Sequence, residues 1–201
     1  DELWSLFHKT NIEHGGEWIE CRMLTSGQRT NPWMQESSNK VIQQGDIVSF
    51  DTDMVGLYGY CADISRAFVE GHKFNSEQKK LYQMATDQIN HNAELIKPGL
   101  SFKEFVKKSW KLPEPYYGNR YSCMVHGIGL CDEWPMIRYT TDGGQREGCF
   151  EKNMTISVET YIGKVGGKEG VKLEQQDLVT DNKLELRSLH PLEAVFYTHL
   201  T

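Results

Sequence analysis

Apolar residues recur at the spacing of an α-helix in three segments of the chain, which cover residues 2–13, 75–96 and 101–110. Each segment keeps its apolar side chains on one stripe, as expected of a helix that packs against a core. Asn75 followed by Gln78, and Ser101 followed by Glu104, are capping-box patterns that mark the first turns of the second and third helices. We therefore predict a long helix that begins after Asn75 and a shorter one that begins after Ser101.

Extended segments rich in β-branched and aromatic residues fill much of the remaining chain. They lie at residues 17–24, 47–50, 60–69, 121–125, 154–162 and 171–180. Gly56 and Gly59 provide a turn between two of these segments, and the glycine-rich stretch 163–170 provides another between the last two. Because strands joined by short turns pair antiparallel, the pattern predicts an α+β domain with helices on one face of a curved, largely antiparallel sheet.

Composition and charge narrow the functional classes. The chain has 201 residues, 38% hydrophobic and 25% charged, which suits one domain over residues 1–201 with its own core. The net charge of −6 disfavours nucleic acid and anionic membranes as partners. No apolar run approaches the ~20 residues of a membrane-spanning helix. The five cysteines show no CxxC spacing, so we expect reduced thiols in a cytoplasmic protein.

Six ionisable residues stand in segments that are otherwise apolar and extended, namely Asp51, Asp53, Asp63, His126, Glu159 and Glu174. Asp51 and Asp53 follow the strand at 47–50, and on a continued strand their carboxylates would lie side by side and repel each other. The turn at residues 56–59 would bring Asp63 back to this pair. A hairpin through residues 163–170 would likewise place the last two acids on neighbouring strands.

A metal ion is the ordinary way to neutralise buried carboxylates that gather in one place. These five carboxylates carry five negative charges, which two divalent cations nearly balance. Five oxygen donors and one imidazole suit Mn²⁺, Fe²⁺, Co²⁺ or Zn²⁺ better than a thiolate-bound metal. Any one of the acids could instead be a surface strand residue. Because all six share the same setting, the sequence predicts a site for two divalent metal ions.

The order of these residues resembles that of the pita-bread metalloenzymes, which include methionine aminopeptidases, Xaa-Pro aminopeptidases and creatinase. The resemblance spans about residues 15 to 182. It is carried by the segments Phe50 to Arg66, Val125 to Gly129, Ser157 to Glu159 and Val171 to Gln176. It implies the pita-bread fold, a dinuclear metal centre held by the six residues above, and a homodimer.

Within this family the sequence departs from the peptidases. Peptidases usually place a second histidine seven positions after the ligand histidine, where this chain has Glu133. A further peptidase histidine would fall within residues 30–34, which read Thr-Asn-Pro-Trp-Met. The chain is more similar to the pita-bread branch of dimethylsulfoniopropionate lyases. The segments that carry this similarity are residues 15–20, 29–33, 50–53, 63–66 and 126–135.

Those lyases cleave a small zwitterion, which carries a sulfonium and a carboxylate, into acrylate and dimethyl sulfide by β-elimination. The resemblance implies that Asp132 is the base, that Tyr121 is the active-site tyrosine and that a metal holds the substrate carboxylate. Aromatic faces suit a sulfonium cation, and a nearby acid would attract it. We therefore predict four further substrate contacts, Trp33, Tyr60, Glu133 and Trp134. The alternatives are core packing for the aromatic residues and an ion pair with Arg66 or Arg138 for Glu133.

The resemblance also implies that the chain is the C-terminal portion of a longer protein and lacks the N-terminal domain that normally precedes it. That domain could contribute to the site in a dimer. Two other functions stay open on the sequence. One is a dinuclear metallopeptidase of the Xaa-Pro aminopeptidase or dipeptidase kind, which would use a metal-bridging hydroxide. The other is a non-catalytic binding module, which the presence of all six predicted ligands disfavours.

Overall fold

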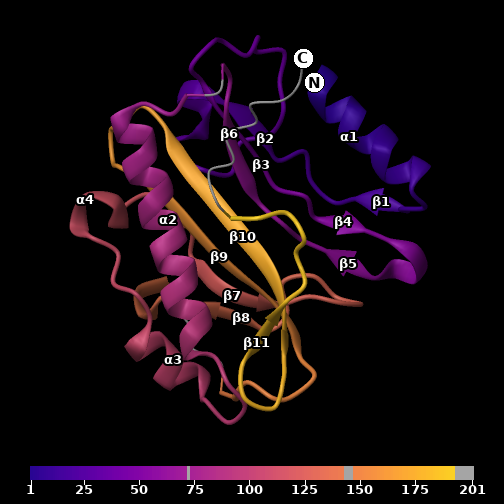
Figure 1. The fold of residues 1–201 in the computed structure, drawn as a ribbon, viewed down its shortest axis with the longest axis vertical. Helices are drawn as coiled ribbons and strands as arrows, with labels where there is room; N and C mark the ends of the chain where they lie inside the picture. Colours follow the sequence, from indigo (N-terminus) through magenta and orange to yellow (C-terminus); the bar gives the residue numbers. More distant parts are fainter. Residues whose placement is uncertain (72, 143–146, 193–201) are drawn as a thin grey trace.

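Two long antiparallel strands form the centre of the structure. Strands β9 (Thr155–Gly163) and β10 (Gly170–Val179) pair along most of their length in the computed structural model, which describes residues 1–71, 73–142 and 147–192. Strands β7 (Cys123–Gly127), β8 (Met136–Arg138) and β11 (Leu184–Leu186) complete a five-stranded sheet in the order β11-β10-β9-β7-β8 (Figure 1). The predicted hairpin through residues 163–170 is confirmed.

Two smaller sheets are built from the first third of the chain. The first joins β1 (Trp18–Ile19), β4 (Met54–Val55) and β5 (Cys61–Ala62) in the order β1-β4-β5. The second joins β2 (Leu24–Ser26), β3 (Ile47–Phe50) and β6 (Arg66–Val69) in the order β2-β3-β6. Strand pairs within all three sheets are antiparallel. The expected α+β class is confirmed, with its strands divided among three sheets.

The idea that Asp51 and Asp53 share one face of a continued strand is wrong. Strand β3 ends at Phe50 and β4 begins at Met54, so both aspartates lie in the break between them. Asp53 has a φ of 35°, in the left-handed region that no strand residue adopts. The return segment is interrupted in the same way, because Asp63 lies between β5 and β6.

The helices agree closely with the capping patterns. Helix α2 (Ser76–Leu95) packs on β9 and β10, while α3 (Phe102–Lys108) packs on β8 and α2 (Figure 1). Helix α1 (Glu2–Glu13) contacts β1, and the short α4 (Glu114–Tyr117) was not predicted. Three 3₁₀ turns cover Gly27–Thr30, Leu57–Gly59 and Thr140–Asp142. Among the described helices, none has the length and apolar character needed to cross a membrane.

The central strands divide their side chains between a core and a polar face. Leu173 of β10 joins Ile89 of α2 and Phe105 of α3 in the main hydrophobic core, and all three are fully buried. Because side chains alternate along a strand, Lys172 and Glu174 point to the opposite face of β10, away from the helices. The five-stranded sheet therefore has a mainly apolar face toward the helices and an opposite face that carries Lys172 and Glu174.

The contribution of the capping box at the start of helix α2 to stability can be tested by substitution. The side chain of Asn75 accepts a hydrogen bond from the Gln78 backbone N–H at 2.9 Å, and Gln78 Oε1 accepts from the Asn75 N–H at 2.9 Å. Replacing Asn75 by Ala should lower the free energy of unfolding by about 1 kcal/mol, because an N-terminal N–H loses its acceptor. Urea denaturation would measure this loss. Gln83→Ala, an exposed change on the same helix, should cost under about 0.5 kcal/mol, and equal losses would contradict the expectation.

Candidate metal centre

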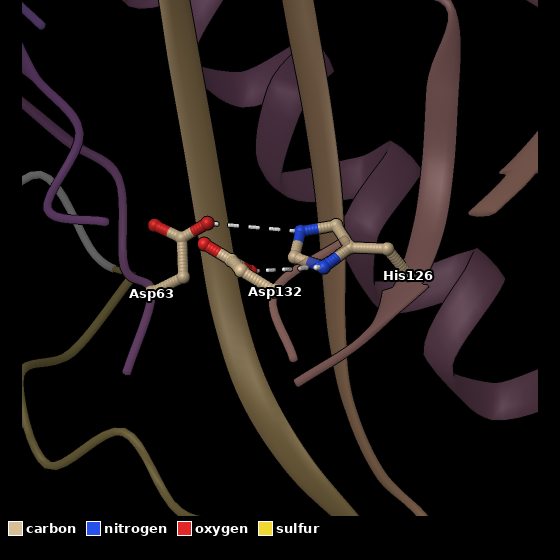
Figure 2. A group of neighbouring side chains, drawn as sticks. All are labelled: Asp63, His126 and Asp132. Carbon is tan, nitrogen blue, oxygen red and sulfur yellow. Dashed lines mark ion pairs between the residues drawn. The ribbon is translucent and has the colours of Figure 1, made fainter. Parts of the chain in front are cut away.

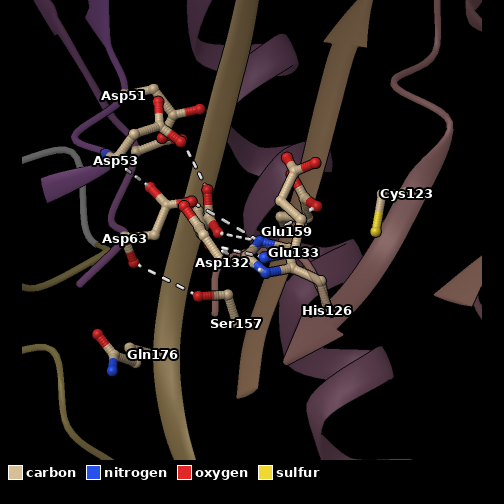
Figure 3. Close-up of polar contacts among 12 residues, drawn as sticks. Asp51, Asp53, Asp63, Cys123, His126, Asp132, Glu133, Ser157, Glu159 and Gln176 are labelled. Atoms are coloured by element: carbon tan, nitrogen blue, oxygen red, sulfur yellow. Dashed lines mark hydrogen bonds and ion pairs between the residues drawn. The ribbon is translucent and has the colours of Figure 1, made fainter. Parts of the chain in front are cut away.

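The polar face of the large sheet brings together acids from distant parts of the chain. Glu159 of β9 and Glu174 of β10 are direct partners in the strand register, and His126 of β7 pairs with Ser157 of β9. Asp51 and Asp63 approach from the smaller sheets, so that the acids of both halves meet in one buried cluster (Figure 3). The predicted convergence of these segments is therefore observed.

One ring nitrogen of His126 forms the centre of this cluster. Its Nε2 lies 2.9 Å from Glu174 Oε1, 3.6 Å from Glu159 Oε1 and 3.7 Å from Asp63 Oδ2. The other nitrogen, Nδ1, donates to the carbonyl oxygen of Gly127 at 3.1 Å. A histidine that donates from one nitrogen presents the other as a metal ligand, which is the usual arrangement at metal sites.

A second group of carboxylates adjoins the first. One oxygen from each of Asp51, Asp63 and Glu174 lies within 4.8 Å of the others. Glu174 also belongs to the group of His126 and Glu159, and Asp63 to a group that contains His126. Asp53 lies beside Asp51 but is not in any such group among the described residues. Its Oδ2 accepts a hydrogen bond from Cys21 Sγ at 3.1 Å instead. The structure thus places five predicted ligands in direct proximity and the sixth at their edge.

Burial and neighbouring charges shift the pKa values of the ionisable groups in the cluster. Burial, followed by the charge of Glu174, raises the pKa of Asp63 well above its ordinary value. Burial also raises the pKa of Glu159 to about 8. Burial alone would lower the pKa of His126, but its hydrogen bond to Glu174 and the charge of Glu159 raise that pKa to about 10. Groups that bind protons so firmly offer the same atoms to a metal ion, which competes with the proton.

The residues present fit a divalent metal ion. Glu159 Oε1 is buried and has no hydrogen-bond partner among the described residues, which is costly for a carboxylate oxygen unless a cation meets it. The donors are carboxylate oxygens and one imidazole nitrogen, which suit first-row divalent ions. The cluster could therefore hold a divalent metal, as its residue types predicted.

Two further polar residues complete the cluster, and the sequence reasoning missed both. The Lys172 Nζ lies 3.1 Å from Asp51 Oδ2, 2.9 Å from Glu159 Oε2 and 2.8 Å from Glu174 Oε2. It also donates to the Ser65 hydroxyl at 2.8 Å. The signal available was the spacing of Lys172 and Glu174, since residues two apart on a strand share a face.

Asp132 lies beside Asp63 and faces the other nitrogen of the His126 ring (Figure 2). Its Oδ1 is 3.8 Å from His126 Nδ1, and an oxygen of Asp132 lies within 4.8 Å of Asp63. The same Oδ1 accepts a hydrogen bond from the Glu133 backbone N–H at 2.8 Å. Burial raises the pKa of Asp132 to about 6, so its carboxylate is more basic than that of an exposed aspartate.

The segment that carries Asp132 is fixed by close backbone packing. A Cβ at Gly127 would lie 1.9 Å from the carbonyl oxygen of Trp134, so only glycine fits there. The Gly127 N–H donates to the Pro135 carbonyl at 2.9 Å, which returns the loop to the strand that carries His126. Asp132 is therefore held near the cluster by the loop that begins at Gly127.

The predicted substrate contacts fall into two sets. Tyr121 donates from its hydroxyl to Glu133 Oε1 at 2.9 Å, and its ring centroid is 5.3 Å from Lys172 Nζ. The buried Trp33 ring lies 6.0 Å from the same nitrogen. Trp33 and Tyr121 also line a cavity of about 200 Å³. The second set consists of Tyr60 and Trp134. Both lie at the surface, where Tyr60 is 57% exposed and Trp134 is 55% exposed.

The sequence and the fold of the chain match those of a family of metalloenzymes. The model of metallopeptidase family M24 matches residues 1–181, and the chain belongs to this family. The prolidase of Pyrococcus horikoshii superposes on 96% of the chain and 55% of its own length, with a TM-score of 0.81 and 24% identity. The pita-bread fold implied by the sequence is thereby confirmed.

Particular relatives are more similar in sequence. The chain is 41% identical to dimethylsulfoniopropionate lyase DddP of Roseovarius nubinhibens, over 96% of the chain and 44% of that protein. It is 32% identical to a Xaa-Pro dipeptidase of Pyrococcus furiosus, over 80% of the chain and 44% of that protein. The chain thus spans less than half the length of these curated relatives. The expected position near the lyase branch of the family is confirmed.

Proposed function

We propose that this chain carries the catalytic centre of a metal-dependent lyase that cleaves dimethylsulfoniopropionate, a small zwitterion, into acrylate and dimethyl sulfide. The observation that carries the proposal is the position of Asp132. This carboxylate lies at the Nδ1 edge of His126, next to the cluster but away from the Nε2 atom that the other acids surround. An acid held in that position can act as a base beside a metal centre. The identity to the lyase of Roseovarius nubinhibens supports the same reaction.

We assign two divalent ions, of Fe, Mn, Co or Zn, to the cluster. The assigned ligands are Asp51, Asp53, Asp63, His126, Glu159 and Glu174. The ions would act as Lewis acids that stabilise negative charge developing on the substrate carboxylate. Asp53 lies at the edge of the cluster, so its assignment rests on the resemblance more than on its contacts.

Asp132 performs the proton transfer in this proposal. Its carboxylate takes the proton from the carbon next to the substrate carboxylate, and the electrons of that C–H bond form the new C=C bond. The C–S bond then breaks with its electron pair kept by sulfur, which leaves as neutral dimethyl sulfide. The proton stays on Asp132 until water takes it. A base placed within ~3 Å of the proton is typically worth 10²- to 10⁴-fold in rate.

Aromatic rings near the cluster suit the other end of the substrate. The rings of Trp33 and Tyr121 lie 6.0 and 5.3 Å from the ammonium group of Lys172. This distance range is favourable for a cation over an aromatic face, and a sulfonium has the same requirement. We assign Trp33, Tyr121 and Glu133 to this end of the site, while Tyr60 and Trp134 would contact substrate only where the site opens to the surface.

The Tyr121 hydroxyl gives a prediction for substrate binding. Tyr121→Phe keeps the ring and removes the hydrogen bond to Glu133, so the Glu133 carboxylate loses its orientation. We expect kcat/KM for sulfide release to fall about tenfold, which is typical of one hydrogen bond to a charged group. Tyr117→Phe is the matched control, since that hydroxyl contacts Thr141 instead. Equal rates for Tyr121→Phe and the unchanged protein would remove Tyr121 from the site.

One assay separates the proposed lyase from a peptidase. A Xaa-Pro dipeptidase is the second candidate, because a dipeptidase of Pyrococcus furiosus is also a relative. The full-length protein, loaded with Mn²⁺ or Fe²⁺, would be given dimethylsulfoniopropionate with headspace detection of dimethyl sulfide, and Xaa-Pro dipeptides in parallel. We expect sulfide without dipeptide cleavage. Dipeptide cleavage without release of dimethyl sulfide would show that the protein is a peptidase and would overturn the proposed lyase function.

A further inference from the structure

Lys172 is a buried cation inside the cluster of acids. The residue is only 1% exposed on the polar face of β10, and its ammonium group contacts three carboxylates at 2.8–3.1 Å. A fully buried ammonium is very costly unless opposite charges and hydrogen bonds surround it. Burial alone would lower the pKa of Lys172, but Asp51 and Glu159 hold that pKa well above its ordinary value. The three short ion pairs, two of them to acids of the central strands, place an ammonium cation among the carboxylates of the cluster.

Lys172 uses carboxylate oxygens other than those that face His126. It contacts Oε2 of Glu174 and Oε2 of Glu159, whereas the Oε1 atoms of both residues lie on the side of His126 Nε2. The same ammonium group also reaches Asp51, which approaches from a different sheet. One cation thus links acids from β9, from β10 and from the segment after β3, without occupying the atoms that surround Nε2.

The charge of Lys172 also completes the electrostatic balance. Five ligand carboxylates carry five negative charges, and the two divalent ions of the proposed function supply four positive ones. The fifth positive charge is Lys172. This step rests on the metal centre of the proposed function but not on the lyase reaction.

We propose that Lys172 is the internal counter-ion of this centre, which holds the acids together when no metal is bound. Without metal, the ion pairs of Lys172 with Asp51, Glu159 and Glu174 offset the mutual repulsion of these carboxylates. With metal bound, the ions take over most of that role, so Lys172 matters less. Because binding and stability are linked, a group that stabilises the metal-free state more than the metal-bound state lowers the affinity for metal.

Melting temperatures measured with and without metal test this proposal. Lys172→Met removes the charge and keeps most of the apolar stem, while Lys172→Arg keeps the charge. The full-length protein would be melted after chelator treatment and again with saturating Mn²⁺. We expect Lys172→Met to lose about 10 °C in the metal-free state and less than half of that with Mn²⁺, with Lys172→Arg close to the unchanged protein.

A lysine outside the centre provides the matched control. Lys40 forms an ion pair with Asp46, and its other hydrogen bonds go to Ser26 and Val41 rather than to the acids of the cluster. Lys40→Met should lower the two melting temperatures equally, because its ion pair does not depend on metal. If Lys172→Met also loses the same amount in both states, its role is packing alone and the proposal is overturned. Failure of Lys172→Met to fold even with Mn²⁺ would overturn it as well.

Metal affinity gives an independent measurement that does not depend on thermal unfolding. Competition with a chelator of known affinity should show Mn²⁺ bound about tenfold more tightly by Lys172→Met than by the unchanged protein. Unchanged or weaker binding would overturn the proposal. If the unchanged protein binds no divalent metal, the metal centre of the proposed function fails as well. If it binds metal but forms no sulfide, only the lyase reaction fails.

Discussion

Asp132→Asn is expected to reduce sulfide release from dimethylsulfoniopropionate at least about 10³-fold without reducing the amount of bound metal. The amide has nearly the same shape as the carboxylate but cannot accept the proton from the substrate. Because Asp132 faces Nδ1 of His126 rather than the Nε2 side, its loss should leave the metal ligands in place. Headspace sulfide analysis and metal content per chain, measured on the same preparation, would check both parts.

The comparison that matters for Asp132 is between activity and metal content. Asp132, Asp63 and His126 also form a group with ligand atoms within 4.8 Å of one another, so Asp132 could instead bind metal itself. In that case Asp132→Asn would lose bound metal together with activity, and the assignment of Asp132 as the base would be contradicted. Asp181→Asn is the control, since Asp181 forms an exposed ion pair with Lys152 and should keep full activity.

Glu174→Gln is expected to abolish both metal binding and activity. Glu174 is shared by two of the candidate ligand groups, and its oxygens also meet His126 and Lys172. Burial alone would raise the pKa of Glu174, but Lys172 and the hydrogen bond from His126 lower it below its ordinary range, so the residue supplies a full negative charge. The neutral amide removes that charge from the middle of the centre. We expect the affinity for Mn²⁺ to fall at least about 100-fold, as measured by chelator competition.

Glu169 provides a control from the same hairpin. It is also a buried acid, but it accepts hydrogen bonds from the Ile47 backbone N–H at 2.8 Å and from Gln78 Nε2 at 2.9 Å. Glu169→Gln should lower stability and keep the metal content. Full metal content in Glu174→Gln would show that the ligand set is wrong.

The elements that the sequence predicted well are those with strong local signals. The helix after Asn75 has a capping box and a long apolar stripe, and it begins one residue after Asn75 as expected. The hairpin of β9 and β10 has apolar strands on both sides of a glycine-rich turn, so the pairing of Glu159 with Glu174 could be inferred. Short elements such as β8, β11 and α4 span too few residues for periodicity to reveal them.

Other parts of the site depend on contacts that no local pattern contains. The aspartates after Phe50 leave the strand because Asp53 adopts a left-handed conformation, which the strand pattern did not indicate. Lys172 was overlooked because lysine on a strand usually reaches solvent, and only the three acids around it explain its burial. Trp134 was predicted from its place beside the motif, yet more than half of it is exposed.

The direct pairing of Glu159 with Glu174 limits how the chain length can vary. Extra residues inserted at the tip of the hairpin, between residues 164 and 169, would lengthen a surface loop and leave both carboxylates facing each other. Deletion of one residue within β10 before Glu174 would instead turn this side chain into the apolar core. Related chains should therefore differ in length at the hairpin tip and keep the number of residues between Gly170 and Glu174 constant.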